Sequence, residues 1–338
     1  MKSTVTAFVK LSCAFVGLAS LAHAGLAQAE PVKVSLASAS MNYAPYLVAI
    51  DKGYFREEGL EVEIVKAPGA SATAALLSGD IPFSTSGATA MSAAMKGAAV
   101  KLVFFPWDRP AFQVWATQPD LKTLDDLKGK TVGIKSRGDA FEIALRMVLM
   151  NHKIDPASIG YTALGQGNGR FATIMSGSLP AAVISSLDVE KLREMGILDK
   201  AHLVYDMYDD VRMPLTSLAV SDAVIQRDRG LVKRFVRASL KGFRYAAAFK
   251  EQTIDIVAKY GDGGRSRDVV ASDYDDVLAS KSEDGTVPLS AMRTEIAVRG
   301  QIMQLAPDKL PKVEKIFDLG MAEEANKELA SGGWKPTP

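Results

Sequence analysis

The sequence predicts an α/β protein built from two similar lobes, and three observations support this fold class. Short apolar strand patterns alternate with helical patterns along most of the chain. One strand–helix–strand–helix–strand run, Val34–Gly87, is followed by a second run with equivalent landmarks. The turns that lead from strands into helices are rich in glycine and serine in both runs. We therefore expect two α/β lobes, with a ligand bound between their matching loops.

The second run repeats the first at a constant offset. The matched landmarks are Val34 with Val132, Ser38 with Ser136, Gly79 with Gly177 and Pro82 with Pro180, and each pair differs by 98 (for example 132 − 34 = 98). The alternative is that α/β proteins simply reuse similar turns. A constant offset at four separated places favours two similar lobes instead.

Two apolar segments set the expected lobe boundaries. Ala111–Ala116 and Leu215–Val220 lie at the edges of the second run, and we interpret them as strands that cross between the lobes. Lobe I then comprises residues 30–109 and residues 218–338 with the C-terminal helices, and lobe II comprises residues 110–217. The chain of 338 residues is long enough for two domains of ordinary size.

In the first run, each short strand is followed by a helix-start signal. Asn42 can cap a helix that has Pro45 in its first turn, Ser71 can cap a short helix, and Ser86-Gly87 opens an alanine-rich helix. The strand at residues 60–66 alternates apolar and polar side chains. Further strands are expected at residues 33–38, 81–85 and 100–105.

The second run predicts the same order of elements. A short helix is expected at Asp120–Gly129, followed by a strand at Thr131–Lys135 and a helix at Ala140–Asn151. Strands at 161–164, 181–184 and 203–206 complete the set, with a flexible turn at 165–169 and a short helix at 171–175. The remainder is helical, and we expect the tail SGGWKPTP to be loosely held.

The first 29 residues have the pattern of a secretory signal peptide. Positive charge precedes an apolar stretch rich in small residues, and Ala27-Gln28-Ala29 forms a cleavage site before Glu30. Ala22-His23-Ala24 is a second possible site. The stretch is too short and too rich in alanine for a stable membrane span. We expect export to the periplasm.

Composition and charge exclude several kinds of partner. The cysteine Cys13 lies within the leader, so the mature chain has no disulfide and no thiol chemistry. Without Lys2 and Lys10 the chain has 38 basic residues (40 − 2) against 39 acidic ones, a net charge of −1. We expect no nucleic acid and no membrane insertion. The basic face of the amphipathic helix at 231–249 could serve either, but we interpret it as a solvated surface.

The mature sequence carries no pattern for catalysis, a metal or a cofactor. His152 and His202 lie fifty residues apart (202 − 152 = 50), and no thiolate accompanies them. A G-x-S-x-G nucleophile turn is absent. The run Gly165–Gly169 resembles a phosphate loop, but Arg170 stands where a dinucleotide fingerprint needs its third glycine. We expect a binding protein without a cofactor.

The strand-to-helix loops supply the candidate ligand site. In α/β sheets, ligands bind beyond the carboxyl ends of strands, where helix N-termini carry partial positive charge. Arg137 could hold a carboxylate or sulfonate with two hydrogen bonds, and Trp107 and Tyr43, with Phe83, could cover an apolar ligand body. The alternative roles are helix capping for the small residues, as for Asp139, and interlobe packing for the aromatics. The candidates are Ser38, Asn42, Tyr43, Gly69, Ser71, Ser86, Gly87, Trp107, Ser136, Arg137, Gly138, Asn168 and Ser185.

Three segments resemble the solute-binding proteins of ABC importers of the sulfonate, taurine and nitrate type, which share a fold with thiamine-pyrimidine precursor proteins. They are YAPYLVAIDKGYFREEGLEVEIV (43–65), LLSGDIPFSTSG (76–87) and LKTLDDLKGKTVGIKSRGDA (121–140). The resemblance implies a two-lobed periplasmic binding protein of type II, with each lobe a mixed sheet flanked by helices. It also implies that the loops after the first and third strands of lobe I and the Ser136 loop touch the ligand. The segment ISSLDVEKL (184–192) departs from the family pattern and leaves the ligand class open.

These observations and the resemblance lead to one functional expectation. We expect a monomeric periplasmic receptor that captures a small organic anion, a sulfonate or carboxylate, by hinge closure and delivers it to an ABC permease in the inner membrane. One alternative is an enzyme that makes the thiamine pyrimidine, which would consume an active-site histidine and pyridoxal phosphate. The other is a receptor that presents its ligand to a sensor kinase.

Overall fold

The computed structural model describes residues 29–67, 69–165, 176–196, 198–261 and 266–338. The expected signal peptide up to residue 28, Asn168 and the expected short helix at 171–175 lie outside the described residues.

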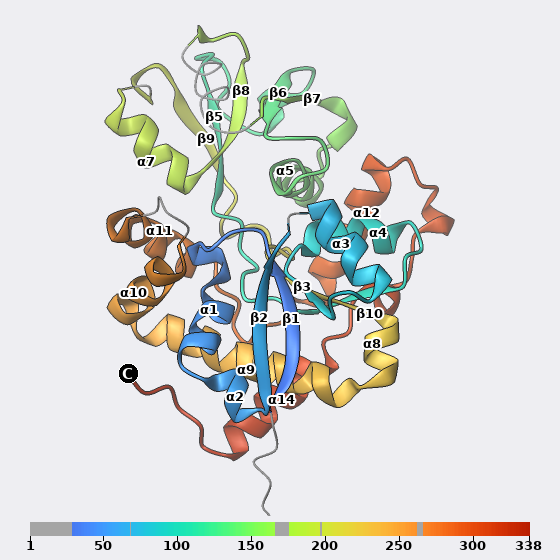
Figure 1. Cartoon of the computed structure of the whole chain (residues 1–338). Coiled ribbons are helices and arrows are strands. Elements are labelled where there is room, and N and C mark those ends of the chain that lie inside the picture. Colours follow the sequence, from blue (N-terminus) through green and yellow to red (C-terminus); the bar gives the residue numbers. More distant parts are fainter. Residues whose placement is uncertain (1–28, 68, 166–175, 197, 262–265) are drawn as a thin grey trace, which may run out of the picture.

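A mixed five-stranded sheet forms the centre of lobe I (Figure 1). Strand β1 pairs in parallel with β2 and β3, whereas β10 runs antiparallel to both β3 and β4. The order is β2-β1-β3-β10-β4, so the last strand to be synthesised lies inside the sheet. The strands are β1 (Glu30–Leu36), β2 (Leu60–Lys66), β3 (Phe83–Ser84), β4 (Val100–Phe104) and β10 (Leu218–Ser221).

Lobe II contains a second five-stranded sheet of the same topology. Strand β6 pairs in parallel with β7 and β8, and β5 runs antiparallel to β8 and β9, which gives the order β7-β6-β8-β5-β9. Here the antiparallel position is taken by the first strand of the lobe. The strands are β5 (Phe112–Ala116), β6 (Thr131–Ile134), β7 (Gly160–Ala163), β8 (Ala181–Ser185) and β9 (His202–Asp206).

The offset of 98 residues reappears in the strand register. Val34 is paired with Phe83 in lobe I, and Val132 is paired with Ala181 in lobe II. Each residue of the lobe II pair is numbered 98 higher than its equivalent in lobe I, since 132 − 34 = 98 and 181 − 83 = 98. The sequence repeat therefore corresponds to a repeated pairing of strands, not only to similar turns.

Helices flank both sheets. In lobe I these are the 3-10 turn η1 (Met41–Tyr43), α1 (Ala44–Asp51), α2 (Tyr54–Glu57), α3 (Gly69–Ser78) and α4 (Gly87–Met95). In lobe II they are η2 (Asp125–Leu127), α5 (Ala140–Asn151), η3 (Pro156–Ser158), α7 (Ser186–Glu194) and η4 (Leu198–Lys200). The helix expected at Asp120–Gly129 is wrong: only the short turn η2 forms there, because the Asp126 carboxylate accepts hydrogen bonds from the N–H groups of Lys122 and Thr123.

The chain after β10 is helical. It forms α8 (Asp222–Arg227), α9 (Arg229–Ala248), α10 (Lys250–Tyr260), α11 (Arg267–Ala279), α12 (Leu289–Ile302), the turn η5 (Pro307–Lys309), α13 (Val313–Ile316) and α14 (Gly320–Ser331). Helix α9 packs on the lobe I sheet, where Phe235 stacks on Phe83 with 3.9 Å between ring centroids. A Cβ at Gly242 would lie 2.0 Å from the carbonyl oxygen of Pro45, so glycine lets α9 approach α1.

The basic face of α9 is not the solvated surface that the sequence predicted. Arg237 binds the carboxylates of Glu58 on the chain after α2 and Glu328 on α14, and Lys241 lies 2.8 Å from Glu57 and 3.1 Å from Glu58. These ion pairs tie three segments of lobe I together. The tail is also held, because Trp334 packs edge-on against Tyr54 at 5.6 Å. No helix within the described residues is long and apolar enough to cross a membrane.

The chain passes between the lobes twice, through residues 105–111 and 207–217. The two passages are joined where the Arg212 Nε donates to Asp108 at 2.6 Å and the Met213 N–H donates to the Asp108 carbonyl at 2.7 Å. Beside them, α12 contacts α5, and Val298 and Ile302 of α12 join the apolar cluster of lobe II (Figure 1). The lobes are therefore joined by two chain passages that are hydrogen-bonded to each other, and they also meet at the apolar contact between α12 and α5.

Candidate functional site

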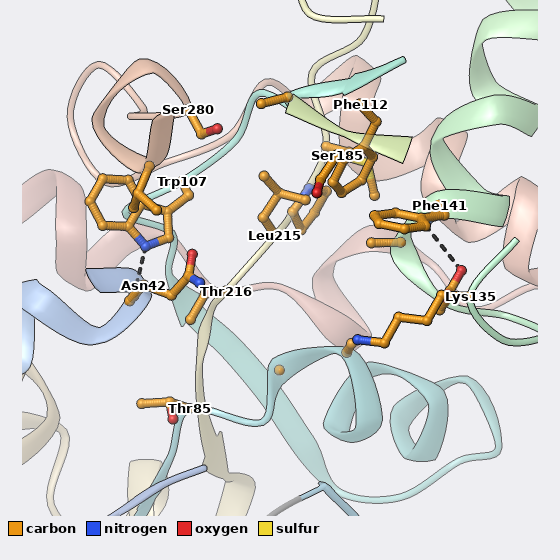
Figure 2. A pocket seen from close by; sticks show the side chains of 18 of the residues that line it. Asn42, Thr85, Trp107, Phe112, Lys135, Phe141, Ser185, Leu215, Thr216 and Ser280 are labelled. Atoms are coloured by element: carbon orange, nitrogen blue, oxygen red, sulfur yellow. Dashed lines mark hydrogen bonds between the residues drawn. The ribbon is translucent and has the colours of Figure 1, made fainter. Parts of the chain in front are cut away.

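A cavity of about 490 Å³ lies between the two lobes. Its walls come from the strand-to-helix loops of both lobes, from the passage at Met213–Thr216, and from α11 and α12 (Figure 2). Among the described helices of eight or more residues, four have their first residue in the wall of this cavity: α3 and α4 from lobe I, and α5 and α7 from lobe II. Helix N-termini bring unpaired N–H groups and partial positive charge, so the cavity is suited to hydrogen-bond acceptors on a ligand.

The lobe I wall is formed mainly by the first turn of α4. Ser86, Gly87, Ala88 and Thr89 all line the cavity, and Ser86 makes no side-chain cap bond to this helix. A Cβ at residue 87 would lie 1.7 Å from the Oγ of Ser217, so only glycine fits at the start of α4. The first N–H groups of α4 thus have no side-chain acceptor from the cap residue.

The lobe II helices are capped by their own side chains. The Asp139 carboxylate accepts hydrogen bonds from the N–H groups of Phe141 and Glu142, each at 3.1 Å, and from Ser136 at 2.8 Å. Burial raises the pKa of the Asp139 carboxyl, although the N–H donors oppose the shift. At α7, the Ser185 Oγ accepts from the Asp188 N–H at 3.3 Å. These two N-termini are therefore already occupied.

Lys135 supplies a positive charge at the cavity. It follows directly after β6, and its side chain runs toward the first turn of α4 in lobe I (Figure 2). No hydrogen bond or ion pair of its ammonium group is found within the described part of the chain. The sequence reasoning missed this residue, although its place at the end of a predicted strand could have drawn attention to it.

Arg137, the cation expected to hold a ligand anion, does not line the cavity. Its guanidinium lies 3.2 Å from the fully buried Glu142 carboxylate and over the ring of Tyr161. Arg146 binds the same carboxylate at 2.8 Å. Glu142 also accepts the Gly138 N–H at 2.8 Å, so this cluster fixes the loop that carries Lys135 and Asp139.

The aromatic wall differs from the one expected. Phe112 and Phe141 of lobe II line the cavity and pack edge to face, with 4.4 Å between ring centroids. Trp107 also lines it but is 1% exposed, and its indole N–H donates to the Asn42 carbonyl at 2.8 Å. Phe83 is absent from the wall, because it is buried against Phe235 in lobe I. Burial raises the pKa of Tyr43, which lines the cavity beside Thr85.

The sequence candidates fall into three groups. Those that line the cavity are Asn42, Tyr43, Gly69, Ser86, Gly87, Trp107 and Ser185. Those that do not are Ser38, Ser71, Ser136, Arg137 and Gly138, and Ser71 lies within α3 because that helix begins two residues earlier. Asn168 lies outside the described residues.

Residues distant in sequence also reach the cavity. Arg299 and Ser280 come from the C-terminal helices, and no local pattern distinguishes them from other helical residues. The Arg299 guanidinium is held by the fully buried Glu295 carboxylate at 2.7 Å and donates to Ser92 at 3.1 Å. Its charge is therefore balanced inside the protein.

His152 and His202, the histidines within the described residues, lie away from the cavity. His152 contacts Tyr205 and Asp210, and the His202 Nε2 lies 2.7 Å from the Leu121 carbonyl. In the part of the chain that the structure describes, no group of three His, Cys, Asp or Glu side chains could hold a metal ion.

A cavity walled by two lobes of equal topology, with helix N-termini converging on it, is characteristic of a two-lobed ligand-binding protein. The NMT1/THI5-like family model matches residues 40–253, which is 214 of 338 residues. The chain belongs to the NMT1/THI5-like family.

Similar structures show the same fold. The putative periplasmic sulfonate-binding protein SsuA of Methylobacillus flagellatus KT superposes with a TM-score of 0.70 at 18% identity, covering 92% of this chain and 98% of that one. The aliphatic sulphonate-binding protein SsuA of Escherichia coli gives a TM-score of 0.67 at 17% identity, covering 85% and 97%. The chain thus has the periplasmic binding protein fold, as expected.

A curated relative is more similar in sequence. The riboflavin-binding protein RibY of Chloroflexus aurantiacus is 29% identical over 232 residues, which span 65% of this chain and 63% of that protein. The match therefore covers less than two thirds of the length of RibY.

Proposed function

We propose that the protein is the substrate-binding component of an ABC importer and that it captures a small organic anion between its lobes in the periplasm. The family and the fold support the class, and the SsuA proteins are themselves described as periplasmic sulfonate-binding proteins. A permease in the inner membrane would be its partner, and a monomer would suffice, because both walls of the cavity come from one chain.

One observation carries the choice of an anion. The N-terminus of α4 in lobe I, which has no side-chain cap bond, faces the ammonium group of Lys135 in lobe II across the cavity, and this ammonium group has no hydrogen bond or ion pair to the described residues. An anionic group between them would accept N–H hydrogen bonds and lie beside a full positive charge. In this proposal Lys135 takes the role that the sequence suggested for Arg137.

The rest of the ligand would lie against the aromatic wall. Phe112, Phe141 and Leu215 border the same cavity, so an apolar or aromatic body is favoured over a bare inorganic ion. Asn42, Tyr43 and Thr85 would supply further hydrogen bonds. Closure of the lobes over the ligand would use the two chain passages as the hinge.

A neutral flavin is the second candidate ligand. The observation in its favour is the similarity to RibY, a riboflavin-binding protein, together with the edge-to-face pair of Phe112 and Phe141. The enzyme alternative finds less support, because neither His152 nor His202 borders the cavity and the mature sequence has no cysteine. A receptor for a sensor kinase would use the same cavity, and growth of a permease deletion strain on the ligand would separate the two roles.

Calorimetry with a defined panel tests the proposal. Benzenesulfonate, benzoate, ethanesulfonate, nitrate and riboflavin would be titrated into the mature protein. We expect an organic sulfonate or carboxylate to bind, and Lys135→Met to weaken that binding roughly ten- to hundred-fold, the range for a hydrogen bond to a charged group. Lys122→Met, at an exposed position of lobe II outside the cavity, is the matched control and should leave affinity unchanged. Binding of riboflavin alone would replace the anion proposal with the flavin, and binding of nitrate alone would overturn the organic ligand.

A further inference from the structure

The position of Lys135 has a consequence for the motion of the lobes. This side chain belongs to lobe II but is directed across the cavity toward the first turn of α4 in lobe I, and both line the same cavity (Figure 2). That turn carries partial positive charge, because its N–H groups lack intrahelical acceptors and Ser86 provides no side-chain cap. In the empty cleft, a full positive charge therefore faces a partial positive charge across the two lobes.

The other charged groups at the cavity do not remove this opposition. Asp139 attracts Lys135, but its carboxylate is bound to three N–H groups of its own loop and of α5. Arg299 is paired with Glu295 beneath the cavity, and Asp276 on α11 has an interaction of its own. Of these groups, the Lys135 ammonium alone reaches toward the opposite lobe without a hydrogen bond or ion pair in the described residues.

We propose that Lys135 makes closure of the lobes depend on the negative charge of the ligand. This inference deepens the proposed function, and the part of its test that uses ligands rests on that function. In the empty protein, the ammonium group opposes closure against α4. A ligand anion placed between Lys135 and α4 turns this repulsion into two attractions, one from each lobe. A neutral ligand of the same shape can occupy the cavity but leaves the opposition in place, so it closes the lobes less.

The expected size of the effect follows from the helix charge. A unit charge near a helix terminus changes an equilibrium by about two- to five-fold at low salt. The closed-to-open ratio of the empty protein should therefore rise by about that factor when the ammonium group is removed. Salt screens such interactions, so the effect should shrink at about 0.5 M salt.

Single-molecule fluorescence transfer between one dye on each lobe tests this in the empty protein. Because the mature chain has no cysteine, two introduced cysteines at exposed positions give specific labelling. Lys135→Met should populate the closed state more than wild type at low salt, and Lys122→Met, which removes an exposed lysine of lobe II outside the cavity, should not. Lys135→Gln serves as a second variant if the methionine disturbs folding. Equal closed populations in wild type and both Lys135 variants would overturn the inference.

A matched ligand pair completes the test. Benzenesulfonate and benzenesulfonamide share a ring but differ in charge. Wild type should close with the sulfonate and much less with the sulfonamide, whereas Lys135→Met should respond to both alike. Equal closure of wild type by both compounds would also overturn the inference. If neither compound binds, the organic-anion proposal fails for this class, and the comparison of empty proteins still decides whether Lys135 opposes closure.

Discussion

The two lobes have the same sheet topology, but the N-termini of their helices are capped differently at the cleft. In lobe I, α4 after β3 begins at Ser86 without a side-chain cap bond, whereas α1 after β1 continues from the turn η1, and its Ala44 N–H donates to the Met41 carbonyl. In lobe II, the equivalent helices after β6 and β8 are capped by Asp139 and Ser185. Topology alone therefore does not decide which lobe presents free N–H groups. The residues at the caps decide it, and α4 of lobe I is the helix whose cap residue leaves its first N–H groups without a side-chain acceptor.

The largest expected effect is the loss of stability when the Glu58 ion pairs of lobe I are broken. Glu58 is hydrogen-bonded to Arg237 and Lys241 in lobe I, and although burial alone would raise its pKa, these partners lower it below the ordinary value of 4.5. Its stabilising contribution is therefore present above pH 4.5 and lost as the pH falls through the lowered pKa. Glu58→Gln should reduce the free energy of unfolding by about 3 kcal/mol at neutral pH, as for a broken buried pair.

Urea unfolding from neutral pH to about pH 3 measures the difference in unfolding free energy between wild type and Glu58→Gln. The difference in unfolding free energy between wild type and Glu58→Gln should narrow as the pH falls, because protonation of Glu58 removes the ion pairs that the variant lacks. Glu61→Gln, at an exposed position of β2, is the control and should differ little from wild type. A gap of constant size over the whole range would contradict the assignment.

The next effect concerns the first residue of α4. Gly87→Val should lower the free energy of unfolding by about 1–3 kcal/mol, because its Cβ would collide with Ser217. The equivalent residue in lobe II is Ser185, since 87 + 98 = 185, and it already carries a side chain. Chemical unfolding of Gly87→Val and Ser185→Ala should show the larger loss in lobe I. Equal losses would mean that α4 can shift away from β10.

A smaller effect is expected at the α5 cap. Asp139→Ala should lower the free energy of unfolding by about 1 kcal/mol, because three N–H groups lose their acceptor. Asp139→Asn keeps an acceptor and should be close to wild type. Thermal melts of the two variants give the comparison, and an alanine variant as stable as the asparagine variant would show that the cap contributes nothing.

The smallest effect would make lobe I resemble lobe II. Ser86→Asp places a carboxylate at the open N-terminus of α4, which should stabilise the fold by about 0.3–1 kcal/mol. The same charge should weaken binding of benzenesulfonate, because it competes for the N–H groups that the ligand would use. Ser86→Asn, which is neutral, is the control. Unchanged calorimetric affinity in Ser86→Asp would place the anion elsewhere in the cleft.

Much of the fold could be predicted because the repeat is visible in local sequence. The fold class is confirmed, and the strands β1, β2 and β6 lie where alternation and apolar runs indicated. Short-range side-chain bonding produced the errors: Asp126 replaced the expected helix at Asp120–Gly129 with a turn. The tail was misjudged because Trp334 finds its partner, Tyr54, far away in sequence.

The candidate site was less predictable, for a physical reason. The loops that line the cavity follow from the rule for strand ends, and residues such as Asn42 and Ser86 do lie there. Arg137 does not, because Glu142 lies five residues further on, within α5, and binds its guanidinium. The spacing of Arg137, Glu142 and Arg146 was a signal in the sequence. Arg299 reaches the cavity only through tertiary packing, so no local pattern indicates it.

The place of β10 inside the lobe I sheet also dictates an order of assembly. Residues 112–206 contain every strand of the second sheet, so lobe II can complete its sheet before the chain that follows has emerged in the compartment where the protein folds. Lobe I, although it begins first, remains split between β3 and β4 until Leu218–Ser221 arrives. During that interval two strand edges are unpaired and open to wrong partners. Lobe I, which begins the chain, is thus the lobe that completes its sheet last. Its two strand edges stay unpaired until all of lobe II has emerged.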